Sequence, residues 1–148
     1  MLTTTFLAAL DHTRIEQAIA AAERLTSGEL RVVIHPGKTD EPLAAAAREF
    51  SRLEMHRTRE RNAILLLVAP RSRRFAFYGD TGIHEKCGPA FWQALADSLE
   101  SDFQREAYTE GIEASLAKAG ELLARHFPRR PDDRNELADH VIEHPPVI

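Results

Sequence analysis

Cysteine is almost absent from this sequence, since Cys87 is the only one among 148 residues. A single cysteine excludes an intramolecular disulfide and any zinc or iron–sulfur site built from several cysteines. The stretch from Met1 to Leu10 also lacks a basic region and a small-residue cleavage site, so no signal peptide is expected. These absences fit a reducing compartment, and we expect a cytoplasmic protein.

Long hydrophobic runs and an excess of positive charge are missing as well. The longest apolar run, from Ala63 to Pro70, is far shorter than the roughly 18 residues of a membrane span. The formal net charge of -4 argues against a general nucleic-acid binder. Arginines cluster at 57–61 and 71–74 without interleaved aromatic residues, and we interpret them as solvated charges at loop ends. We therefore expect neither a membrane span nor a nucleic-acid partner.

The common catalytic motifs are absent too. The sequence has no G-x-S-x-G, G-x-G-x-x-G or G-x-x-x-x-G-K-[ST], and no EF-hand calcium loop. Residues 140–144 match H-x-x-E-H, in which two histidines one helical turn apart hold zinc, but Pro145 follows at once and no third ligand lies downstream. His84 with Cys87 is a comparably weak metal pair. No nucleophile is identified by motif, so the sequence leans away from an enzyme.

What is present is the alternation of helical and strand patterns typical of an α/β protein. A composition of 43% hydrophobic and 28% charged residues suits one globular domain over residues 1–148. Apolar residues at three- and four-residue steps predict helices, and β-branched or continuously apolar runs predict strands. The predicted order is helix 13–25, strand 29–35, helix 42–55, strand 63–69, strand 75–78, helix 91–103 and helix 109–127.

This order predicts a three-layer α/β/α sandwich with a small mixed central sheet flanked by helices. The right-handed crossover rule makes the first two strands parallel, and the third runs antiparallel to the second. The core spans about 13–128, and 129–148 is predicted as an acidic, proline-containing loop, with room for a short extra strand there or before the first helix. In detail, Thr13 and Thr109 are expected as helix caps, and Leu43 is expected on the buried face of its helix.

The topology brings distant polar residues to one edge of the sheet. The starts of the first two strands and the end of the third must meet there, together with Glu29, Asn62 and Asp80. Asp80 lies between glycines in a strand-to-helix turn, where irregular backbone and oxygen donors suit a hard cation such as Ca²⁺. We predict these three residues as metal ligands. The structural alternative is that Asp80 is a turn residue or a helix cap.

A second acidic cluster follows the last helix. Its oxygen donors lie within eight residues and are also predicted as metal ligands: Asp132, Asp133, Asn135, Glu136 and Asp139. The alternative is a capped turn that begins a short helix, with Asp133 as N-cap and Glu136 at the third position. Whether the two clusters form one site, two or none is left open.

Several segments in fixed order resemble a known family, the TPM domain in its short bacterial form. They are TSGELRV, RNAILLLVAP, FAFYGDTGIHEKCGPAFW, YTEGIEASLAKAGELLARHFP and DDRNELAD, and the resemblance spans about 14–141. It implies a central β-sheet flanked by helices. For function it implies two different activities, because acid phosphatase activity is ascribed to the plant relative, whereas binding of calcium or other divalent ions is ascribed to members that include bacterial ones.

Three hypotheses follow. The leading one is a divalent-cation-binding module, with Ca²⁺ as the cofactor and a regulatory or protein-interaction role. The alternative is a metal-dependent phosphatase acting on phosphomonoesters, in which Asp80 and either Arg61 or Arg31 act beside a metal-activated water. The third is an interaction module that holds a protein partner through the sheet edge or the acidic tail, with no response to metal.

Overall fold

The computed structural model describes residues 1–129 and 141–143 of the chain. Its elements are α1 (Thr3–Ala9), α2 (His12–Glu23), β1 (Glu29–Ile34), α3 (Pro42–Arg52), β2 (Ala63–Ala69), η1 (Pro70–Ser72), β3 (Arg74–Gly79), α4 (Thr81–Lys86), α5 (Pro89–Gln104), α6 (Tyr108–His126) and β4 (Val141–Glu143). The predicted order of the long helices and of the first three strands is confirmed. The short elements α1, η1, α4 and β4 are added to it.

The four strands form one mixed sheet in the order β3-β2-β1-β4. Strands β1 and β2 are parallel, with Glu29 opposite Ala63, and β3 runs antiparallel to β2, with Gly79 opposite Ile64. Strand β4 pairs in parallel with the other side of β1. The predicted strand directions are confirmed, and β4 is the short extra strand for which the C-terminal pattern left room.

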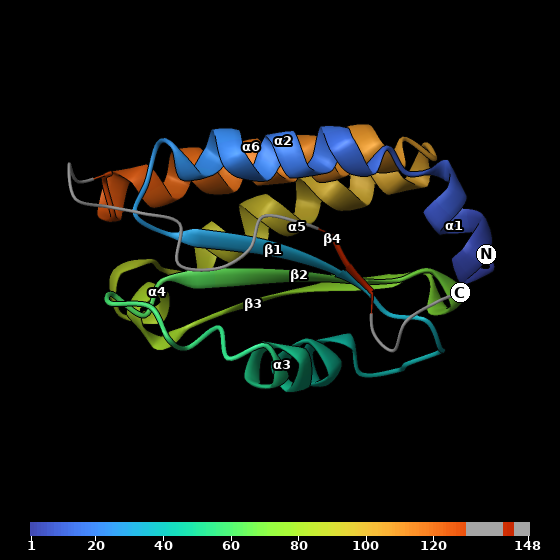
Figure 1. Ribbon diagram of the computed structural model, residues 1–148, viewed down its shortest axis with the longest axis horizontal. Coiled ribbons are helices and arrows are strands. Elements are labelled where there is room, and N and C mark those ends of the chain that lie inside the picture. The colour runs from blue at the N-terminus through green and yellow to red at the C-terminus, as the bar shows by residue number, and fades with distance from the viewer. Residues whose placement is uncertain (130–140, 144–148) are drawn as a thin grey trace.

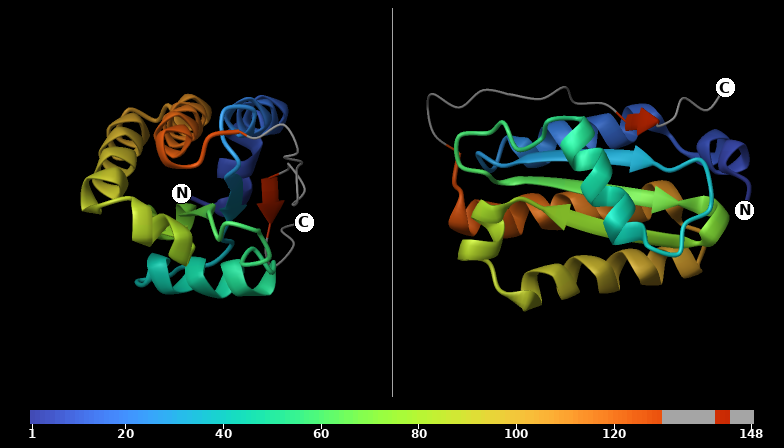
Figure 2. Two further views of the ribbon diagram at one scale, coloured as in Figure 1. Left: turned by 90° about the vertical axis from the view of Figure 1, so that its left-hand side faces the viewer. Right: turned by 90° about the horizontal axis from the view of Figure 1, so that it is seen from below.

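Helices cover both faces of this sheet (Figure 1). Helices α2, α5 and α6 lie on one face and α3 lies on the other, as the end-on view of Figure 2 also shows. Successive strand residues point to opposite faces, so Val32 packs in the core under α2 and α6, whereas Val33 joins the core under α3. All seven residues of β2 are buried, as expected for a strand covered on both sides. The predicted three-layer sandwich is confirmed.

Some predicted details of the helices are wrong. Helix α2 begins at His12 with Asp11 as its cap, because the Asp11 carboxylate accepts the Arg14 N–H at 3.1 Å. In α3, Leu43 is exposed and Glu49 is buried instead. The Glu49 carboxylate is held at 2.9 Å by Arg52, one turn further along, which offsets the cost of burying an acid.

The start of the chain packs more tightly than the sequence indicates. Phe6 of α1 is buried against Phe103 and Tyr108, which are about 100 residues away in the chain. Thr109 does not cap α6, which begins one residue earlier, and its hydroxyl accepts the Asp11 N–H at 3.1 Å. This bond joins the N-terminal ends of α2 and α6.

The strand near the C-terminus argues against the H-x-x-E-H zinc motif. That motif needs a helix to bring both histidines to one face, but Val141–Glu143 is a strand. The flanking His140 and His144 lie outside the described residues. None of the helices in the described part of the chain combines the length and apolar character needed to cross a lipid bilayer.

Candidate functional site

The strand ends that the sequence predicts to meet do lie together at one edge of the sheet. Asn62, which directly precedes β2, donates from Nδ2 to Ser27 Oγ at 3.1 Å, just before β1 begins. The last residue of β3, Gly79, pairs with the second residue of β2. We call residues 27–29, 60–62 and 79–82 the Asp80 edge; it lies at the end of the sheet where α4 is drawn in Figure 1.

Asp80 directly follows β3, and its buried carboxylate forms an ion pair with Arg61. Arg61 Nε donates to Asp80 Oδ2 at 2.8 Å and Nη2 donates to Oδ1 at 3.0 Å, which is a two-pronged ion pair. This hydrogen bond raises the pKa of the Arg61 guanidinium above its ordinary value. Asp80 is only 4% exposed, whereas the Arg61 side chain is 49% exposed. The pair therefore joins a buried anion to a cation that reaches water.

Asp80 also caps helix α4. Its Oδ1 accepts the Thr81 N–H at 2.7 Å, and its own N–H donates to the Ala63 carbonyl at 3.0 Å. The structural alternative stated from the sequence, a helix cap, is thus confirmed for Asp80. Capping uses Oδ1, whereas Oδ2 accepts a hydrogen bond from Arg61, so the cap does not exclude a second positive partner.

Gly82 is required where the turn after β3 meets the loop before β2. A Cβ at this position would lie 2.2 Å from the Glu60 carbonyl oxygen and 2.6 Å from that of Arg61. Both contacts are with backbone, which cannot move aside as a side chain can. The Gly82 N–H instead donates to the Arg61 carbonyl at 2.9 Å. The glycine beside Asp80 therefore serves the close approach of two backbone segments.

Glu60 is a carboxylate at this edge that the sequence did not indicate. Its Oε2 accepts a hydrogen bond from Ser27 Oγ and lies 3.4 Å from Asn62 Nδ2. The loop is fixed from within, because the Asn62 N–H donates to the Thr58 hydroxyl at 3.3 Å. The only available signal was position, since Glu60 precedes Arg61 and Asn62 in the loop that leads to β2.

Glu29 belongs to a different, buried cluster. Its Oε2 lies 3.3 Å from Arg31 Nη2, and Arg31 Nη1 lies 2.9 Å from Glu23 Oε2 at the end of α2. The same Glu23 oxygen accepts the Leu30 N–H at 2.8 Å, on the stretch of β1 that precedes its pairing with β4. All three charged side chains are at most 8% exposed. Alternate charged residues at 29 and 31 in a buried strand were the sequence signal for this cluster.

The predicted metal ligands are only partly placed by the structure. Asn62 and Asp80 lie at the same edge, and Glu29 begins β1 beside them but pairs with Arg31. Within residues 1–129 and 141–143, no three His, Cys, Asp or Glu side chains are grouped closely enough to hold a metal ion. The remaining predicted ligands lie outside the described residues: Asp132, Asp133, Asn135, Glu136 and Asp139. Metal binding by these residues stays a prediction.

The weak pair of His84 and Cys87 has packing roles. The His84 ring packs against Trp92, with the ring centroids 5.4 Å apart and the planes tilted by 37°. Cys87 follows α4 and is 7% exposed, and burial raises the pKa of its thiol. A buried thiol with a raised pKa is a poorer nucleophile and metal ligand than an exposed one.

The fold and the Asp80 edge together define a class of protein, a three-layer α/β domain whose parallel strands begin at a polar, partly charged edge. The chain belongs to the TPM family, because the model of the TPM domain matches residues 3–122. This confirms the resemblance drawn from the sequence segments.

Solved structures agree with this assignment. The BA42 protein from the psychrophilic bacterium Bizionia argentinensis shares 30% identity over 91% of this chain and 95% of its own, with a TM-score of 0.86. The N-terminal domain of cg2496 from Corynebacterium glutamicum has 14% identity over 92% of this chain and 80% of its own, with a TM-score of 0.59. An N-terminal domain from P. gingivalis has 20% identity over 83% of each chain, with a TM-score of 0.61. The last two show a shared fold only. No curated protein matches the chain.

Proposed function

We propose that this TPM-family protein binds a divalent cation, with Ca²⁺ as the best-matched ion, at the Asp80 edge. One observation carries the proposal: the buried Asp80 carboxylate has a half-exposed arginine as its partner. A half-exposed arginine can turn into solvent without leaving a buried positive charge behind. The carboxylate can therefore exchange Arg61 for another cation that takes over the neutralisation of its charge.

Oxygen donors of the kind that Ca²⁺ accepts are available on the neighbouring residues. The Glu60 carboxylate and the Ser27 hydroxyl are hydrogen-bonded to each other, and the Glu60 carbonyl faces the turn at Gly82. Calcium takes six to eight oxygens from carboxylates, carbonyls and water in irregular geometry. Glu29 and the acidic residues of 132–139 remain candidates for further ligands, each to be tested by substitution.

In this proposal Arg61 and the cation compete for Asp80. The experiment therefore measures whether an added ion stabilises the folded protein. Chelator-treated protein is unfolded thermally with and without millimolar Ca²⁺, Mg²⁺, Mn²⁺ or Zn²⁺. An ion that binds the folded state raises the midpoint, and an ion at 100 times its Kd adds about 2.7 kcal/mol. We expect the largest rise with Ca²⁺ and a smaller one, or none, in Asp80→Ala.

The decisive variant is Arg61→Ala, which removes the competitor and should strengthen the response to Ca²⁺. Arg57→Ala is the matched control, because Arg57 is an exposed arginine of the same loop that pairs with Glu54 instead. Equal gains in both variants would show a general charge effect and remove Asp80 from the site. No rise with any ion in the unmodified protein would overturn the proposal.

For the phosphatase alternative, one observation reduces the set of residues that could act in catalysis. Arg31 is 2% exposed and lies between Glu23 and Glu29, so it is not placed to meet a phosphomonoester at the surface. Only the Arg61 and Asp80 pair remains of the arrangement considered from the sequence. Metal-dependent hydrolysis of p-nitrophenyl phosphate that Asp80→Asn loses would support this alternative, and its absence would leave cation binding alone.

A further inference from the structure

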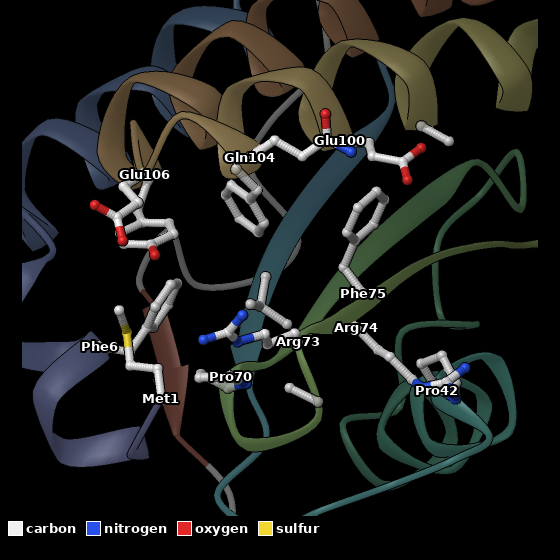
Figure 3. Close-up of a pocket in the computed structure, with 15 residues that line it drawn as sticks. Met1, Phe6, Pro42, Pro70, Arg73, Arg74, Phe75, Glu100, Gln104 and Glu106 are labelled. Carbon is white, nitrogen blue, oxygen red and sulfur yellow. The ribbon is translucent and has the colours of Figure 1, made fainter.

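A groove of about 710 Å³ lies at the opposite end of the sheet from the Asp80 edge. It opens between the β2–β3 turn, the start of α1 and the junction of α5 with α6, as Figure 3 shows. Its volume falls in the range typical of ligand pockets. We call it the hairpin groove.

The floor of the hairpin groove is a connected row of aromatic rings. The Phe75 ring lies 5.9 Å from that of Phe103, which lies 5.5 Å from Tyr108, and Tyr108 lies 5.1 Å from Phe6. All four residues line the groove. Such a floor suits a large apolar side chain, because aromatic rings offer wide contact surfaces with little mobility.

Charged side chains stand on opposite walls of this groove without meeting. Arg73 and Arg74 belong to the turn and the start of β3, whereas Glu100 and Glu106 belong to the helical side. In the described part of the chain, none of the four forms an ion pair with another side chain. Arg73 has a left-handed backbone, with φ of 52°, and lies in the middle of the groove, whereas Arg74 reaches toward Pro42 (Figure 3). The arginine wall favours a carboxylate, and the glutamate wall repels one.

Strand β3 leads directly out of the hairpin groove and forms the margin of the sheet (Figure 2, right). The Asp80 N–H bonds to Ala63 across the β2–β3 pair, so by the alternation of antiparallel bonding Tyr78 and Ala76 face β2. The backbone N–H and C=O groups of Phe75 and Phe77 therefore point away from the sheet. No backbone partner occupies them within residues 1–129 and 141–143.

The geometry points to a peptide-binding site in which an extended segment of another protein pairs with β3 and places a large apolar side chain in the hairpin groove. A carboxylate of that segment, from an adjacent acidic residue or a chain terminus, meets Arg73, and Arg74 adds positive charge at the rim of the groove beside Pro42. Backbone pairing supplies affinity and the side-chain pocket supplies specificity in this mode of recognition. The inference does not depend on cation binding, because the two sites lie at opposite ends of the sheet.

The test begins with random 12-residue peptides displayed on phage and selected on the full chain. The most enriched sequence is synthesised, and its binding is measured by fluorescence anisotropy. We expect enriched peptides to carry an aromatic or large aliphatic residue beside an acidic group. Double charge reversal, Arg73→Glu with Arg74→Glu, should weaken binding about tenfold or more. Arg71→Glu, on the same turn but outside the groove, is the matched control and should change affinity little.

Backbone pairing is tested on the peptide rather than on the protein. N-methylation of one alternate set of peptide amides should abolish binding, whereas N-methylation of the other set should leave it nearly unchanged, because only one set faces β3. Equal binding of both methylated peptides would overturn pairing with β3. Failure to enrich any peptide, or equal loss with Arg71→Glu, would overturn the site. A doubled molecular mass in sedimentation that Phe77→Lys abolishes would instead make the occupant a second copy of this chain.

Discussion

The two ends of the sheet treat charge differently. At the Asp80 edge and in the buried cluster that begins at Glu29, acidic and basic groups meet within the chain. Arg61 pairs with Asp80 in the first, and Arg31 pairs with Glu23 and Glu29 in the second. At the hairpin groove, Arg73 and Arg74 line the side of the β2–β3 turn and Glu100 and Glu106 line the helical side, and no ion pair joins the two sides within the described residues. A charged group bound within the chain must give up a partner before it binds a ligand, whereas a group that faces a groove has none to give up. Clusters of polar residues in the sequence therefore predict the Asp80 edge better than they predict the hairpin groove.

The largest difference in stability between variants at the two ends is expected at the buried cluster of Glu23, Glu29 and Arg31. Arg31→Ala leaves Glu23 and Glu29 buried without their shared cation, and breaking a buried ion pair costs roughly 3–5 kcal/mol. Urea unfolding should show this loss, whereas Arg74→Ala at the hairpin groove should stay within about 0.5 kcal/mol. A loss below about 1 kcal/mol in Arg31→Ala would mean that the carboxylates find other partners or become protonated on burial.

A smaller effect is expected from closing the space at Gly82. Gly82→Ala places a Cβ against two backbone carbonyls, and forcing such a contact typically costs about 1–3 kcal/mol. Because the turn carries Asp80, the variant should also lose part of its response to Ca²⁺. Gly37→Ala is the matched control, since nothing lies within 4 Å of the added methyl. It should be neutral or slightly stabilising, and equal destabilisation in both variants would contradict the packing argument.

The sequence predicted the meeting of strand ends better than the contacts made there. Helical periodicity and the apolar run of β2 were enough for the topology, and the crossover rule then placed Asn62 and Asp80 at one edge. The choice of Arg61 as the partner of Asp80 depends on a left-handed backbone at Arg61, with φ of 52°. Nothing local in the sequence requires that conformation, because glycine or asparagine is its usual signal.

Long-range packing explains what sequence reasoning missed. Helix α1 is too short to show periodicity, and Phe6 is buried only because Phe103 and Tyr108 lie beside it in the fold. The hairpin groove likewise combines residues from the start of the chain, from the β2–β3 turn and from the junction of α5 with α6. The arginines of 71–74 were interpreted as solvated charges at a hairpin end, and the structure adds that two of them line a groove.

The next expected effect is on reactivity rather than on stability, and it concerns access to a thiol at each end. Cys87 lies near the Asp80 edge and is buried, so it should react slowly with Ellman's reagent at pH 8. A cysteine placed at the groove, Ala96→Cys in a Cys87→Ala background, should react much faster because Ala96 lines open space. Equal reaction rates would contradict the contrast between a closed end and an open one.

The Cys87 thiol also makes stability depend weakly on pH. Burial raises its pKa in the folded protein, so the folded state holds the proton more tightly than the unfolded state. This contribution is fully present below the pKa of the unfolded thiol and is lost as pH rises through the pKa of the folded one. Urea unfolding between pH 7 and pH 10 should therefore show a decline in stability that is shallower in Cys87→Ala. Parallel declines in the two proteins would assign the alkaline loss to other groups, because Cys87→Ala has no thiol proton to lose.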